Sequence, residues 1–167
     1  MLKGVGKINK YLTDWCKSNG FKVKCRIGSD FEYDRIHNIV YYSFVISDDH
    51  DKLFKSLCSQ YLSNDIQECD TFILSFFHEL GHYLSKDDYD EDEWDKYFKL
   101  KERLTNKKRC TDKDFIKYIM HPIELEATIR GCEYLNSHID NVEIFAGNLS
   151  KLTTEFFKLN NIEDLTN

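Results

Sequence analysis

The sequence predicts an α+β fold that is mostly helical, with one small, mostly antiparallel sheet near the N-terminus. Three observations lead to this prediction. Apolar residues recur at steps of three and four over most of the chain, aromatic and β-branched residues gather between positions 21 and 46, and one proline and seven glycines interrupt 167 residues. A chain of this length most simply forms one domain, so we expect residues 1–167 to fold as a single domain.

The N-terminal quarter predicts a helix followed by strands. Residues 3–19 carry apolar side chains on one helical face, at Val5, Ile8, Leu12 and Trp15. Residues 21–28 alternate apolar and basic side chains, which is typical of a half-buried strand. Residues 31–46 are rich in aromatic and β-branched side chains and predict one or two further strands, with a break near His37 and Asn38.

The remainder of the chain predicts helices, over residues 47–64, 70–85, 96–117, 122–135 and 141–160. The segment 70–85 is apolar on nearly every side, so we expect a helix buried in the core, capped by Asp70 or Thr71. Residues 86–95 carry seven acidic groups, and the simplest interpretation is a solvated loop before a basic helix.

The composition and charge of the chain narrow the partners and the compartment that we expect. A net charge of −6 argues against nucleic acid as a partner, because nucleic-acid binders normally carry a basic patch. No apolar run approaches the roughly 18 residues that cross a bilayer, so we expect no membrane partner. The start of the chain is a poor secretion signal and the six cysteines form no CxxC pair. We therefore expect free, mostly buried thiols in a cytoplasmic protein.

The motif that carries chemistry is His78-Glu79-Leu80-Gly81-His82, an HExxH pattern inside the predicted buried helix. Residues four apart lie one turn apart on the same helix face, so both imidazoles can bind one zinc ion. Glu79 is rotated by about 100° from His78, which places its carboxylate beside the metal, where it can accept a proton from water. The other interpretation is a coincidental motif, with two core histidines bonded to backbone or water.

A catalytic zinc site needs a third protein ligand, and residues 122–127 offer two carboxylates, Glu124 and Glu126. The two face about 200° apart on a helix and cannot both reach one ion. Glu124 shares its face with small and apolar residues, which suits close packing on another helix. Glu126 shares a charged face with Arg130 and Glu133 and can pair with Arg130. We expect Glu124 to be the ligand and keep Glu126 as the alternative, while both could also be ordinary surface acids.

These motifs resemble those of a known family. HELGH on a hydrophobic helix, followed about forty residues later by Glu-Leu-Glu-Ala at residues 124–127, is similar to the gluzincin metallopeptidases, and most of all to the small ImmA/IrrE type. The likeness implies a zincin-like fold in which the small sheet packs on the HExxH helix. It also implies one zinc ion per chain, held by His78, His82 and Glu124, with Glu79 as the general base.

The resemblance also has a departure. Related gluzincins often carry Asp or Asn after the alanine, where this chain has Thr128, whose hydroxyl could support a metal-bound histidine more weakly. The motifs do not fix which residue donates a hydrogen bond to the oxyanion. Four residues near the ligand helix are candidates: His121, Tyr118, Tyr134 and His138.

The function that the resemblance implies is zinc-dependent hydrolysis of peptide bonds. The partner is then a protein or peptide substrate, drawn from a limited set of intracellular proteins such as regulators. A non-catalytic binding or regulatory module on the same scaffold is the alternative function, and a helical domain without metal is a third.

Overall fold

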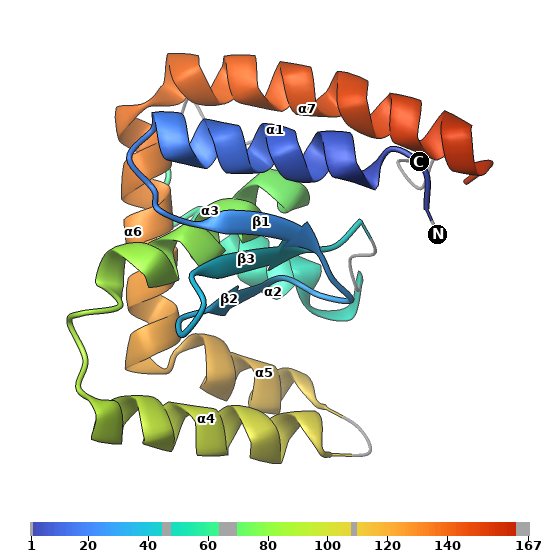
Figure 1. Ribbon diagram of the computed structural model, residues 1–167. Coiled ribbons are helices and arrows are strands. Elements are labelled where there is room, and N and C mark those ends of the chain that lie inside the picture. Colours follow the sequence, from blue (N-terminus) through green and yellow to red (C-terminus); the bar gives the residue numbers. More distant parts are fainter. Residues whose placement is uncertain (1, 45–47, 64–69, 108–109, 163–167) are drawn as a thin grey trace. The chain divides into compact units, whose positions relative to one another are not determined.

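Helices form most of the structure, and one three-stranded sheet completes it (Figure 1). The computed structural model describes residues 2–44, 48–63, 70–107 and 110–162. These residues form α1 (Val5–Ser18), β1 (Lys24–Ile27), β2 (Glu32–Asp34), β3 (Ile39–Tyr42), α2 (Asp48–Cys58), α3 (Thr71–Ser85), α4 (Glu91–Thr105), α5 (Asp112–Ile119), α6 (Pro122–Ser137) and α7 (Ile139–Asn160). The predicted α+β class is confirmed.

The chain divides into two compact units. The first contains the residues up to 43 together with those from 138 onward, and the second contains residues 44–137. The first unit therefore holds α1, the sheet and α7, while the second holds α2 to α6. That the whole chain forms one domain stays a prediction, as does the packing of the sheet on α3.

The sheet of the first unit is mixed, whereas the sequence predicted a mostly antiparallel one. Its order is β1-β3-β2, with β1 parallel to β3 and β2 antiparallel to β3. Two chain reversals return β3 to the direction of β1, and β3 takes the central place because it is the most buried strand. The predicted break near His37 and Asn38 is confirmed: Asn38 adopts a positive φ of 52° between β2 and β3. Residues 45 and 46 of the predicted strand segment lie outside the described residues.

Helix α1 lies between the sheet and α7 within this unit, packing on both (Figure 1). Its buried residues Ile8, Leu12 and Cys16 follow the predicted helical spacing. Toward α7, the ring of Trp15 lies 4.5 Å from that of Phe145 between centroids. This unit thus has an apolar core of its own.

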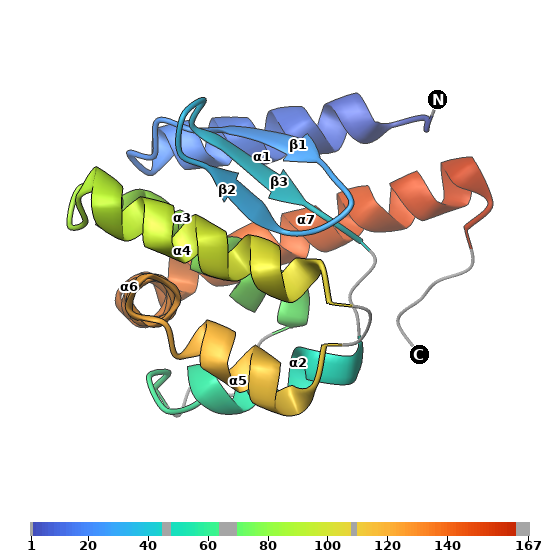
Figure 2. The same ribbon diagram turned by 90° about the horizontal axis from the view of Figure 1, so that it is seen from below.

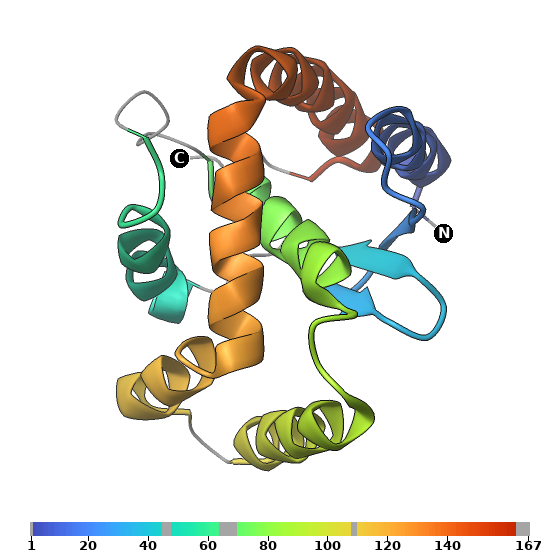
Figure 3. The same ribbon diagram turned by 90° about the vertical axis from the view of Figure 1, so that its left-hand side faces the viewer.

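The second unit is organised around the crossing of α3 and α6 (Figure 3). A Cβ atom on Gly81 would lie 1.9 Å from the carbonyl oxygen of Ala127, and one on Gly131 would lie 2.5 Å from that of Phe77. Both distances are far below van der Waals contact, so each glycine lets the backbone of the other helix approach directly. The α3–α6 crossing therefore depends on two glycines, one of which lies inside the HExxH motif.

The acidic block at 86–95 is not a loop throughout, which corrects the prediction. Helix α4 begins within it, at Glu91, and Asp90 and Glu93 form a capping box. The physical reason is that acidic side chains in a first turn favour the positive end of the helix dipole.

The predicted basic helix over 96–117 is also corrected, because two helices cover this segment. Helix α4 ends at Thr105, and α5 starts at Asp112 behind a second capping box between Thr111 and Asp114. Figure 2 shows α4 and α5 as separate helices. A local cap thus starts a new helix in a stretch whose composition favours helix throughout.

The cysteines of the described residues agree with the prediction of free, mostly buried thiols. The five cysteines of the described residues are free, and four of them are buried: Cys16, Cys25, Cys58 and Cys132. Cys69 lies outside the described residues. Among the described helices, none is both long and apolar enough to cross a membrane.

Replacing Gly81 with alanine tests the helix crossing. We expect Gly81→Ala to lower the free energy of unfolding by about 3 kcal/mol, the upper end for overpacking, because its Cβ would overlap backbone rather than a flexible side chain. Gly147→Ala in α7 is the matched control, since a Cβ there meets no atom of the described residues within 4 Å. This control should gain about 0.5–1 kcal/mol from helix propensity. Equal effects in urea unfolding would contradict the close crossing.

Candidate metal centre

Helix α3 places His78, Glu79 and His82 together. It begins at the predicted cap, where the Asp70 side chain accepts a hydrogen bond from the backbone of Phe72 at 2.7 Å. From there an unbroken α-helix brings the two imidazoles onto one face, with ring centroids 4.8 Å apart. One ligand atom from each of His78, Glu79 and His82 lies within 4.8 Å of the others. This group could hold a metal ion.

Helix α6 brings Glu124 to the same point. Its Oε2 lies 3.0 Å from Nε2 of His78, and its Oε1 lies 3.5 Å from Nε2 of His82. Glu124 is 2% exposed, whereas Glu126 lies on the other side of α6 and accepts a hydrogen bond from Nε of Arg130 at 2.8 Å. The two carboxylates thus lie where the helix-face argument expects them, and the ligand role of Glu124 stays a prediction.

Thr128 settles which nitrogen of His78 carries hydrogen. Its hydroxyl donates to the backbone carbonyl of Glu124 at 3.0 Å, and its Oγ1 lies 3.0 Å from Nδ1 of His78. A hydroxyl has one hydrogen, so toward His78 it can only accept, and Nδ1 must be the donor. Nε2, which faces Glu124, is then free to present its lone pair to a cation.

The second histidine is held differently. Nδ1 of His82 is buried and has no hydrogen-bond partner among the described residues, while Trp94 and Tyr97 of α4 lie with their rings 6.4 Å from the imidazole. Packing therefore holds this ring on the side of Nδ1, while its Nε2 lies 3.5 Å from Oε1 of Glu124. On the other side, Phe54 of α2 meets the ring of His78 edge-on at 5.4 Å.

Sequence reasoning missed Tyr97. Its hydroxyl donates to Oε1 of Glu124 and lies 3.2 Å from the hydroxyl of Tyr118. Tyr97 belongs to a buried cluster with Trp94 and Ile123. The signal was present in the sequence, because Trp94 and Tyr97 are aromatic residues three apart in an otherwise charged segment, which marks the buried face of a helix.

The four residues suggested as oxyanion donors lie in different places. His121 immediately precedes α6, with its ring 5.4 Å from that of Tyr97, and Tyr118 joins the same cluster. Tyr134 stacks on Phe77 at 5.7 Å, and His138 belongs to the other unit, at the start of α7.

The buried charges shift each other's pKa. Burial alone would raise the pKa of Glu124, but the charge of His82 and the hydrogen bonds to both histidines hold it well below its usual range. Burial alone would lower the pKa of His78, yet its hydrogen bond to Glu124 and the nearby carboxylate charges raise it. Burial raises the pKa of Glu79. Without a metal, Glu124 and His78 therefore each favour the charged form of the other.

The donor set could hold a divalent metal ion. Two imidazole nitrogens and a carboxylate converge from two helices, and the hydrogen bond at Thr128 leaves the correct nitrogen of His78 available. A divalent cation would take the place of the proton between His78 and Glu124, and the carboxylates of Glu124 and of neighbouring Glu79 would together balance its charge.

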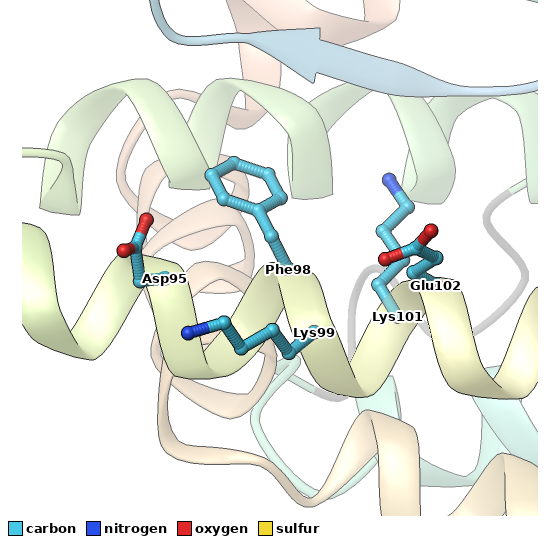
Figure 4. A pocket seen from close by; sticks show the side chains of 5 residues that line it. All are labelled: Asp95, Phe98, Lys99, Lys101 and Glu102. Atoms are coloured by element: carbon cyan, nitrogen blue, oxygen red, sulfur yellow. The ribbon is translucent and has the colours of Figure 1, made fainter.

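A surface pocket of about 450 Å³ lies on α4 and is lined by Asp95, Phe98, Lys99, Lys101 and Glu102 (Figure 4). None of these residues belongs to the group formed by His78, Glu79, His82 and Glu124. Lys101 connects the two regions electrostatically, because its charge opposes the effect of burial on the pKa of Glu79.

Comparison of the chain with models of protein families, with curated proteins and with solved structures gives no match.

The stability of the metal-free protein should depend on pH through the His78–Glu124 pair. The raised pKa of His78 stabilises the fold fully below its ordinary value near 6.5, and this contribution is lost as the pH rises through the raised value. The lowered pKa of Glu124 stabilises the fold above its ordinary value near 4.5, and this contribution is lost as the pH falls through the lowered value.

We therefore expect the thermal midpoint in excess chelator to be highest between about pH 4.5 and 6.5 and to fall as the pH rises above 6.5. Glu124→Gln should reduce this alkaline fall, because the carboxylate that raises the pKa of His78 is gone. Parallel pH profiles for the two proteins would show that the pair does not form.

Proposed function

We propose that this protein is a zinc-dependent metallopeptidase of the ImmA/IrrE-like gluzincin type, which cleaves a limited set of proteins. One observation carries the proposal. His78 and His82 of α3 and Glu124 of α6 converge to hydrogen-bonding distance, with Glu79 beside them. This is the ligand composition of a catalytic zinc site that keeps one position for water or substrate.

When bound, the zinc ion would polarise the carbonyl of the scissile bond and acidify water. In this proposal, Glu79 takes a proton from the attacking water and delivers it to the amine that leaves. Burial raises the pKa of Glu79, which brings the carboxyl closer to the working pH of a general base than an exposed glutamate would be. Glu79 is 6% exposed, so it also acts away from bulk water.

For the oxyanion, we propose His121 as the donor. Its Nδ1 accepts a hydrogen bond from the backbone of Ile123 at 3.4 Å, which places the ring hydrogen on Nε2. Burial lowers the pKa of His121, so the ring is neutral at pH 7 and Nε2 donates a single hydrogen bond.

A second candidate function is a non-catalytic module in which the metal is structural. The observation that favours it is the burial of the centre: His82 is 5% exposed and Glu124 is 2% exposed. Structural zinc sites are closed in this way, although they normally have four protein ligands. Glu79 would then be a fourth ligand rather than a base.

Zinc binding is the first test. We expect about one zinc ion per chain purified without a histidine tag. Glu124→Gln should lower the affinity by more than about 100-fold, because it removes a ligand and not merely a supporting group. Glu126→Gln, on the same helix and paired with Arg130, should bind zinc as the unmodified chain does. Equal losses in both variants, or a loss only in Glu126→Gln, would reject Glu124 as the ligand.

Cleavage is the second test. We expect the zinc-loaded protein to create new N-termini in a proteome-derived protein mixture, scored by N-terminal mass spectrometry. Glu79→Gln should keep the zinc and lose this cleavage, because the amide cannot accept the proton. If Glu79→Gln loses its zinc instead, Glu79 is a ligand and the second candidate function holds. Cleavage that survives with zinc bound would show that Glu79 is not the base.

A further inference from the structure

Tyr97 contacts the carboxylate of Glu124, the proposed metal ligand. The proposed function does not use this contact. Its hydroxyl donates to Oε1 of Glu124, the oxygen that lies 3.5 Å from His82. The other oxygen, Oε2, faces His78 at 3.0 Å. The carboxylate is therefore held through both of its oxygens, and its rotation about the last side-chain bond is constrained.

The two tyrosines form a directed chain of hydrogen bonds. Since the hydrogen of Tyr97 is given to Glu124, the hydroxyl of Tyr118 must be the donor across the 3.2 Å that separate the two. The chain runs from α5 through α4 to α6. Tyr97 is 3% exposed, so its hydroxyl would be costly to bury without these partners.

We infer that Tyr97 is a positioning residue for the metal: it orients the Glu124 carboxylate toward the two histidines and thereby sets the affinity of the centre for zinc. The inference rests on the metal site of the proposed function. A carboxylate ligand that is fixed before binding loses less freedom when the metal arrives, and groups that orient metal ligands typically contribute 10–100-fold to affinity. The tyrosine keeps its hydrogen for this purpose, since burial and the charge of Glu124 raise its pKa far above neutrality.

The chain offers a matched control in the same aromatic cluster. Tyr89 packs against Trp94 and Ile123, as Tyr97 does, but its hydroxyl donates to the carbonyl of Pro122 at 3.1 Å and not to Glu124. Tyr89→Phe and Tyr97→Phe remove the same atom from the same cluster. Only the second change removes a partner of the proposed ligand.

The experiment measures the zinc dissociation constant of the full chain by chelator competition, and the absorption spectrum of the Co²⁺-loaded chain. Tyr97→Phe should weaken zinc binding by about 10–100-fold and alter the Co²⁺ spectrum, while Tyr89→Phe changes neither. Both variants should unfold at similar temperatures in excess chelator. This pattern would separate a positioning role from general packing.

The outcomes that overturn the inference are distinct from failure of the proposed function. An unmodified chain that binds no zinc overturns both. Zinc binding by the unmodified chain with an unchanged constant in Tyr97→Phe, or with equal losses in Tyr97→Phe and Tyr89→Phe, overturns only the role of Tyr97. If Tyr97→Phe does not fold, Tyr118→Phe decides, because it removes the hydroxyl that supports both Tyr97 and the Glu124 carboxylate. Weaker zinc binding supports the inference, and an unchanged constant overturns it.

Discussion

The direct contact between the backbones of α3 and α6 is the constraint on which the rest of the second unit depends. Gly81 and Gly131 remove the side chains that would separate the two helices. The reach of a glutamate side chain is limited, so Glu124 contacts both imidazoles only when its own helix lies against the helix that carries them. Gly81, the glycine of HELGH, thus has a structural role in the helix crossing as well as a place in the motif.

Bringing three ionisable side chains together in a buried place has an electrostatic cost. The structure offsets it by mutual pairing: the histidines hold the pKa of Glu124 low, and Glu124 raises that of His78. A buried charge with a hydrogen-bonded partner is tolerated, whereas a single one is strongly destabilising. The same arrangement offers a divalent cation a preformed set of donors, which is how the metal-free state and the proposed zinc-bound state can share one geometry.

Hydrogen bonds extend this organisation beyond the proposed ligands. Thr128 fixes the donor nitrogen of His78 from within α6, and Tyr97 of α4 holds the opposite oxygen of Glu124. Thr128 lies four residues from Glu124 on the same helix, α6. Tyr97 lies on α4, which comes between α3 and α6 in the sequence. Thr128 directly follows Ala127, and its hydroxyl makes the contact with His78.

Local sequence by itself determined much of this protein. The period of apolar residues located the long helices, and Asp70 capped α3 as its chemistry requires, because these features depend on neighbours within one or two turns. The helix face also separated Glu124 from Glu126. Tertiary structure decided what depends on distant partners: the parallel pairing of β1 with β3 and the contact of Tyr97 with Glu124. Periodicity shows which side of an element is buried, but not what it is buried against, so the arrangement around the carboxylate follows only from the packed chain.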